Sequence, residues 1–503
     1  MKTKQQKLKL TLFLILAASF NLLFWKEFVG INYLLYSTIF LSGLIAQHPE
    51  RLKHTATLSS FSALLISLFS VIWVNSVLSI IMYLISSTLF VSFYYQSKIK
   101  SIYYALPASI LNLFYSTLNI KGELSELTPK TNSRRSYRKW IKLLVGPILV
   151  AVVFGIIYME SNPLIEQYTV LAWDSITSYL SEFFTNDTLF RMAFIIVGVM
   201  LSGFFIYYKQ GKLFSYIDEK QGDVIVRKNK RKSRTFTLNA LLDENRSAIA
   251  TLLFLNVLVF LVNVVDVWKV WISFDYDQGA TLSSELHKGI YLLILSIVLS
   301  IAVLAYFFRG NLNFLKQNKP LKILGYVWLG QNILLAITAF IKCLYYINYY
   351  SFTYKRIGVL VFLLATMFGL GMMFMKLHKQ KSVYFLLRAN TWFIYLFLVG
   401  ATLVNWDNVI AQYNLKIVTF TEPDYRYLMS LSEKTFPVLL ENEAFMEMHK
   451  EKSLSQFYGN YWTFPNIDHK IDKYLMIQEQ LSFLSWNRSS HVLTNYFKNH
   501  QLK

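Results

Sequence analysis

The chain has 503 residues, of which 54% are hydrophobic and only 16% are charged, with a formal net charge of +21. A soluble protein of this length has about 25% charged residues, and a disordered chain lacks the apolar residues that abound here. Both classes are therefore excluded. The basic excess predicts Lys- and Arg-rich loops on the cytoplasmic side of a membrane, since no signature of a nucleic-acid-binding fold accompanies it.

Long apolar runs follow one another along the first 400 residues, and each run is apolar on all sides, as lipid or a bundle core requires. A membrane-spanning helix needs about 20 mostly apolar residues. Eleven runs meet this requirement: Leu8–Trp25, Phe28–Ala46, Thr57–Val74, Ser76–Tyr95, Ile141–Tyr158, Leu189–Tyr208, Ser247–Val265, His287–Phe308, Lys322–Ile341, Arg356–Met375 and Ser382–Leu403.

Two segments leave an alternative open. Ser101–Asn119 is also apolar, but Pro107 interrupts it, and a crossing there would place the basic residues of 134–139 outside; an interfacial or re-entrant helix keeps them inside. The first span could instead be a cleaved signal peptide, because Ala17-Ala18-Ser19 resembles a cleavage site. Its apolar run continues to Trp25, which favours an uncleaved span, and cleavage would leave the remaining topology unchanged.

Charge sets the orientation. The N-terminal lysines and two basic loops, 121–140 and 209–245, are predicted to lie in the cytoplasm, whereas the loop 159–188 has acidic residues from Glu160 to Asp187 and is predicted to lie outside. Residues 404–503 lack a spanning run and then form a small extracytoplasmic helical domain. Within it, Lys470–Phe497 has apolar residues at helical spacing, which predicts one amphipathic helix. The fold class is an all-α polytopic transmembrane bundle with this helical tail.

Several short phrases are similar to those of a bacterial family of uncharacterised polytopic inner-membrane proteins, a domain of unknown function of the Bacteroidetes type. They are Leu23–Glu27 with Gly30–Asn32, Ser161–Leu164, Tyr306–Phe314, Tyr354–Val359, Asn405–Asp407 with Ile410–Ala411 and Tyr413–Leu415, Tyr427–Ser432 and Leu484–Asn487. Their order and spacing carry the resemblance from near residue 20 to near residue 490. It implies a bacterial inner membrane and transfers no activity.

Ionisable residues gather at the predicted outer ends of the later spans. These residues are Asp266, Glu285, His287, Lys342, Lys355, Arg356 and Asp407. Charges in or near hydrocarbon tend to pair or to line a cavity, so one interpretation is a polar pocket in which Asp266 and Asp407 face Lys342 and Arg356. It would hold an anionic or zwitterionic headgroup or a small solute. The simpler interpretation is a set of interfacial residues wetted by water and phosphate, which is the commoner arrangement.

Other polar features have two interpretations each. Asn256, Asn263, Gln331, Asn332 and Asn390 lie inside spans, where they could line a pathway or hold helices together. Six basic residues of the second cytoplasmic loop could contact anionic lipid or act as an orientation signal only: Arg227, Lys228, Lys230, Arg231, Lys232 and Arg234.

The sequence has no phosphate-binding loop, dinucleotide fingerprint, HExxH helix or nucleophile elbow. The single cysteine, Cys343, and eight scattered histidines predict neither a disulfide nor a metal site. No cofactor is predicted.

Three functions remain. The first is a non-enzymatic envelope component that docks protein or lipid partners through the outer loop, the tail and the basic loop. The second is a transporter or lipid-handling protein that uses the outer polar residues. The third is a membrane enzyme acting on lipid or glycan, which needs a carboxylate such as Asp266 or Asp407 as a base.

Overall fold

The computed structural model describes residues 2–127, 187–209, 211–227, 238–272, 279–416, 424–442, 445–447 and 467–500, together with single positions between 147 and 175. The secondary structure of this part is helical, apart from one isolated β-bridge between Val224 and Lys381. The protein is therefore an all-α polytopic helical bundle. The chain divides into two compact units: unit 1 contains residues 1–216 and 481–487, and unit 2 contains residues 217–480 and 488–503.

Ten of the eleven predicted spans coincide with described helices. Within the described residues, eight helical segments are long and apolar enough to cross a membrane, and Ile31–Gln47 and Leu293–Phe307 are shorter apolar helices. The remaining predicted span, Ile141–Tyr158, lies outside the described residues, as do most of the loop 159–188 and residues 128–140 of the first basic loop. The protein is a multi-pass α-helical membrane protein.

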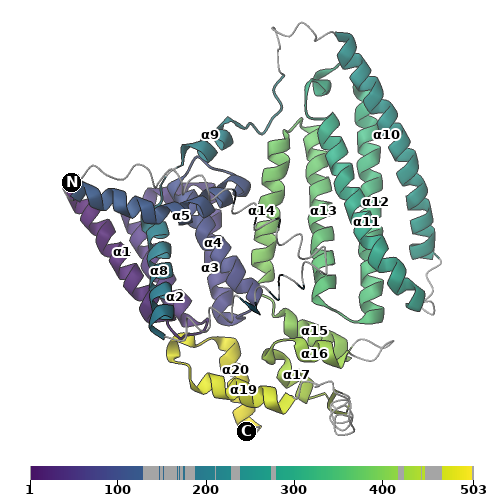
Figure 1. The fold of residues 1–503 in the computed structure, drawn as a ribbon. Coiled ribbons are helices and arrows are strands. Elements are labelled where there is room, and N and C mark those ends of the chain that lie inside the picture. Colours follow the sequence, from purple (N-terminus) through teal and green to yellow (C-terminus); the bar gives the residue numbers. More distant parts are fainter. Residues whose placement is uncertain are drawn as a thin grey trace. The chain divides into compact units, whose positions relative to one another are not determined.

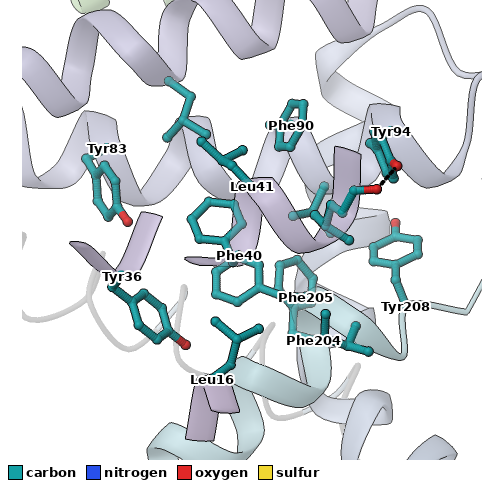
Figure 2. Packing of buried hydrophobic residues seen from close by; sticks show 14 of the residues in the cluster. Leu16, Tyr36, Phe40, Leu41, Tyr83, Phe90, Tyr94, Phe204, Phe205 and Tyr208 are labelled. Atoms are coloured by element: carbon teal, nitrogen blue, oxygen red, sulfur yellow. Dashed lines mark hydrogen bonds between the residues drawn. The ribbon is translucent and has the colours of Figure 1, made fainter. Parts of the chain in front are cut away.

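Unit 1 is built from α1 (Lys2–Phe24), α2 (Ile31–Gln47), the short η1 (Pro49–Lys53), α3 (Thr55–Trp73), α4 (Val77–Tyr95), α5 (Ile102–Leu127) and α8 (Asp187–Ile206). Helix α1 packs against α8 and α2, and α3 packs along α4. Figure 2 shows the aromatic core that α2, α4 and α8 contribute, in which the rings of Phe40 and Phe205 stack at 4.5 Å. Aromatic side chains therefore fill the space between these spans.

Local signals explain the tight turn between α3 and α4. Asn75 has a φ of 52°, a left-handed conformation that asparagine tolerates better than most residues. Ser76 then caps the start of α4 with a capping box. Its side chain accepts a hydrogen bond from the Ser79 backbone N–H, and the Ser79 hydroxyl accepts one from the Ser76 backbone N–H.

Helix α5 runs crosswise to the other helices of unit 1 (Figure 1). The hydroxyl of Ser109 donates to the Thr88 carbonyl of α4, and farther along α5 the hydroxyl of Ser116 donates to the Met200 carbonyl of α8. Pro107 lies inside the helix without ending it. This placement supports the interfacial interpretation of 101–119, which stays a prediction.

Unit 2 contains α10 (Leu238–Val267), which continues into the π-helical turn η2 (Trp268–Ile272), followed by α11 (Gly279–Phe307), the short η4 (Asn311–Phe314), α12 (Lys319–Tyr350), α13 (Tyr354–His378) and α14 (Val383–Ala401). Figure 1 shows these long helices side by side, and α12 contacts α10, α11 and α13. The second basic loop is partly helical, because α9 (Lys212–Lys220) and the start of α10 lie within 209–245.

The tail is helical, with α15 (Trp406–Lys416), α16 (Tyr425–Ser430), η5 (Glu433–Thr435), α17 (Phe436–Leu440), α19 (Ile467–Glu479), η6 (Phe483–Ser485) and α20 (Arg488–Asn499). Its core also receives Ile357 from the first turn of α13. The prediction of one continuous helix over Lys470–Phe497 is wrong. That stretch forms α19 and α20, and the residues between them, Leu481–Asn487, belong to unit 1.

Candidate functional site

Helices α10 and α12 are joined by a repeated asparagine contact. The Asn256 amide donates to the Leu324 carbonyl at 3.2 Å, and seven residues farther along both helices the Asn263 amide donates to the Gln331 carbonyl at 3.1 Å. Equal seven-residue steps on both helices mean that they run parallel with the packing period of a coiled coil.

The same amides keep a free hydrogen-bond acceptor. In the described structure, Oδ1 of Asn256, Oδ1 of Asn263 and Oε1 of Gln331 are buried and have no hydrogen-bond partner. Asn263 is only 4% exposed. A buried amide oxygen without a partner costs about 1–3 kcal/mol, so a bound donor at this position would recover free energy.

A groove of about 790 Å³ lies beside Asn263 and Gln331. Its other lining residues are mostly apolar: Phe260, Val264, Val265, Val267, Trp268, Lys269, Ile272 and Leu334. Phe260, Val265 and Ile272 have large exposed surfaces, which in a spanning helix face lipid. The groove ends beside η2, and π-helical turns occur frequently at functional sites. It combines an apolar body with a few polar groups, as ligand sites usually do.

An ion pair lies one turn farther along α10. Lys342 Nζ is 2.8 Å from Asp266 Oδ1, and the two side chains are 17% and 14% exposed. Asp266 lies 20 residues after Arg246, and Lys342 lies 20 residues after Lys322. That length is about 30 Å of helix, which equals the hydrocarbon thickness. The structure thus joins two of the predicted site residues, and their position at a membrane boundary opposite Arg246 and Lys322 stays a prediction.

Arg356 and Asp407 take other partners. The Arg356 guanidinium donates to the Tyr350 carbonyl at 2.8 Å and to the Ser351 carbonyl, and it lies 4.3 Å from the Tyr346 ring centroid. Ser351, with a φ of 84° and a ψ of 167°, occupies a region that side chains rarely adopt. The guanidinium thus holds a strained turn between α12 and α13.

The Asp407 carboxylate receives two hydroxyl donors. Tyr354 donates to Oδ1 at 2.7 Å and Ser432 donates to Oδ2 at 2.5 Å. The Tyr354 backbone N–H donates in turn to the Tyr427 hydroxyl. Nearby, burial lowers the pKa of Lys434 to about 8, although the Asp407 charge acts in the opposite direction. Asp407 is therefore a hydrogen-bond centre that ties α13 to the tail.

The profile of a protein family described as "Domain of unknown function (DUF4153)" matches residues 57–442. The chain belongs to this family. The match confirms the resemblance inferred from the sequence phrases. No curated protein and no solved structure matches the chain.

Five of the phrases that carry the resemblance meet in two groups in the described structure. In unit 2, the phrases Tyr354–Val359, Asn405–Asp407 and Tyr427–Ser432 converge on the Asp407 carboxylate. In unit 1, Leu484–Asn487 contacts Gly30–Asn32, since the Ile31 N–H donates to the Trp486 carbonyl at 2.9 Å. Both of these unit 1 phrases lie outside the region matched by the DUF4153 profile.

The other predicted site residues are placed as follows. The side chains of Glu285 and His287 lie outside the described part of this DUF4153 chain, and Lys355 is exposed. Of the basic loop, Arg227 is described and exposed, whereas Lys228, Lys230, Arg231, Lys232 and Arg234 lie outside the described residues.

Three polar contacts at the other end of unit 2 were not predicted. Arg388 pairs with Asp223 at 2.7 Å, Tyr384 donates to the buried Asp218 at 2.8 Å, and the buried Lys376 donates to the Phe308 carbonyl at 2.7 Å. Both aspartates lie within the basic loop 209–245, ahead of its basic cluster 227–234, and are far from their partners in sequence. Arg388 lies near the end of the predicted span Ser382–Leu403, and this position is the one sequence feature that could have indicated a partner.

Proposed function

We propose that this DUF4153 protein is a non-enzymatic component of a bacterial inner membrane that binds a lipid in the groove between α10 and α12. The observation that carries the proposal is Asn263, whose buried carbonyl oxygen has no hydrogen-bond partner in the described structure and which lines a groove whose remaining wall is mostly apolar. A lipid suits both features of the groove, because its acyl chains cover the apolar wall and its headgroup donates a hydrogen bond to the amide oxygen. Lys269 at the groove suits a headgroup that also carries a phosphate.

The contacts of the two candidate bases favour binding over catalysis. A general base must be within reach of the proton that it removes. Asp266 is held in the pair with Lys342, and Asp407 accepts two hydroxyl donors at 2.5–2.7 Å. Both carboxylates therefore hold helices together, and this role favours binding over proton transfer.

The test replaces the groove amides and measures retained lipid. The variant Asn263→Leu removes the acceptor in the groove, and Asn256→Leu is the matched control, because Asn256 makes the same contact with α12 one repeat away and does not line the groove. We expect wild type and Asn256→Leu to retain one enriched lipid class through purification and Asn263→Leu to lose it. Equal retention by Asn263→Leu, or no enrichment in wild type, contradicts the proposal.

Docking of envelope proteins through the tail stays a prediction. A crosslinked pull-down from native membranes that reads proteins and lipids together separates the two roles. A reproducible protein partner with no enriched lipid would favour docking.

A further inference from the structure

We propose that unit 1 holds a second and independent site, which binds one chain of a phospholipid with a primary ammonium headgroup. The chain would lie in an aromatic cavity between α1, α2, α4 and α8, with the ammonium at the Glu27 carboxylate. This site shares no residue with the groove of unit 2, so either proposal can fail without the other.

The cavity has a volume of about 580 Å³, within the range of about 300–1,000 Å³ typical of small-molecule sites. Phe20 and Phe24 of α1, Tyr36 of α2, Tyr83 of α4 and Phe205 of α8 contribute aromatic walls. In Figure 2, Tyr36, Tyr83 and Phe205 form part of the packed aromatic core that borders the cavity. The aromatic wall of the cavity is thus packed against the core of unit 1.

The deep hydroxyl groups are already paired. The Tyr83 hydroxyl forms a hydrogen bond of 2.7 Å with Ser37, and the Tyr36 hydroxyl lies 3.4 Å from the Ser202 hydroxyl. Hydroxyls that are satisfied by the protein gain little from a polar solute. The interior therefore suits a hydrocarbon chain.

The length of the cavity matches one leaflet of a bilayer. Its lining on α8 runs from Phe194 to Phe205, a separation of 11 residues, or about 16 Å of helix. The hydrocarbon layer is about 30 Å thick, so the lined length is close to half of it. A lipid chain entering from the nearer membrane surface would fill this length.

Charge at the rim indicates the headgroup. Among the described residues that line the cavity, Glu27 carries the one charge. Ser485 donates a hydrogen bond to its carboxylate, and a carboxylate has acceptor capacity for further donors. Lys26 and Arg191, both exposed, lie 6.0 Å and 5.5 Å from the Trp25 ring centroid. Adjacent negative and positive groups complement a zwitterion, with the ammonium at Glu27 and the phosphate at the two bases.

The chain holds Glu27 in place with contacts from its far end. The Phe28 N–H donates to the Ser485 hydroxyl at 2.8 Å, and the Asn32 side chain spans the turn through the Leu23 and Phe28 carbonyls. Gly30 allows the closest approach, because a Cβ there would lie 2.4 Å from the Ser485 carbonyl carbon. Such positioning is what a charged binding group requires.

The experiment titrates the purified full-length protein with dioleoyl phosphatidylethanolamine, phosphatidylcholine or phosphatidylglycerol and counts bound lipids by native mass spectrometry. Leu201→Trp fills the cavity, and Val197→Trp, at a position 48% exposed on the same helix, is the control. We expect one ethanolamine lipid on wild type and Val197→Trp, and none at this site in Leu201→Trp. The groove variant Asn263→Leu should keep this lipid.

The headgroup has its own pair of variants, which need no cavity filling. Glu27→Gln removes the charge at the cavity, whereas the control Glu50→Gln removes the charge of an exposed carboxylate of the same unit that does not line the cavity. We expect Glu27→Gln to lose on the order of tenfold in preference for ethanolamine over choline, the effect of one charge-assisted hydrogen bond, and Glu50→Gln to keep the preference. Equal binding of the three lipids by wild type, or an unchanged preference in Glu27→Gln, overturns the proposal.

Discussion

Replacing Lys342 by methionine tests whether α10 and α12 are joined by a truly buried ion pair. The substitution keeps the apolar stem of the side chain and leaves the Asp266 carboxylate, 14% exposed, without its counter-charge. Removing one partner of a buried pair costs about 3–5 kcal/mol, whereas an exposed pair contributes about 0–1 kcal/mol. The low exposure of both side chains places this pair in the first class, and we expect a loss of about 3 kcal/mol in the free energy of unfolding.

Equilibrium unfolding in mixed detergent–SDS micelles, followed by tryptophan fluorescence, measures the loss. The double variant Asp266→Leu/Lys342→Met removes both charges and should unfold within about 1 kcal/mol of wild type, because an apolar pair can replace a buried ion pair. Lys355→Met is the control, since Lys355 is exposed at the neighbouring helix start, and it should lose less than about 1 kcal/mol.

Two results would refute this reasoning. If Lys342→Met loses less than about 1 kcal/mol, the pair behaves like a surface pair, and the interpretation of wetted interfacial residues is the correct one. If the double variant is as unstable as the single variant, the loss comes from packing and not from an uncompensated charge.

Three further changes have definite expected outcomes. Ser351→Gly should raise the unfolding free energy by about 1 kcal/mol in the same assay, because glycine relieves the strain of a φ of 84°. Gly30→Ala should lower the unfolding free energy by about 1–3 kcal/mol, because the added Cβ pushes Ser485 away. It should also expose the loop 481–487 to protease. The control Gly330→Ala, with open space at its Cβ, should have neither effect. Burial lowers the pKa of Lys434 from 10.5 to about 8, so the unfolded chain binds more protons between these values and stability should rise with pH across that window; Lys434→Met should abolish this rise.

The spans could be predicted because their signal is local. A run of 20 apolar residues must form a helix in lipid, since every backbone polar group has to be satisfied within the segment. The turn at Asn75 and the cap at Ser76 are also local signals. The break between α19 and α20 was missed for the opposite reason. Apolar spacing continues through it, and what interrupts the helix is a contact with Gly30 and Ile31 more than 450 residues away.

The polar residues at the predicted outer ends of the spans could likewise be predicted only in part. The sequence placed Asp266 and Lys342 at one depth, and the structure pairs them. It also suggested that Asp407 faces Arg356, whereas Asp407 accepts from Tyr354 and Ser432. Hydroxyl donors carry no charge and show no pattern in sequence. Their hydrogen bonds to the Asp407 carboxylate could therefore not be predicted, because they depend on how the tail packs against α13.

The amides within the spans had two alternative interpretations, a pathway or a means of holding helices together, and one asparagine can do both. Its NH₂ group donates to a neighbouring helix, as Asn256 and Asn263 do to α12, while its buried carbonyl oxygen has no partner in the described structure. In a bilayer such helix-to-helix hydrogen bonds contribute only about 0.6 kcal/mol on average. Asn263→Leu should therefore cost little stability, about as much as Asn256→Leu, while it alone removes the acceptor in the groove. We therefore expect stability and binding to separate at Asn263, because its NH₂ group makes the contact with α12 whereas the proposed lipid donates to its carbonyl oxygen.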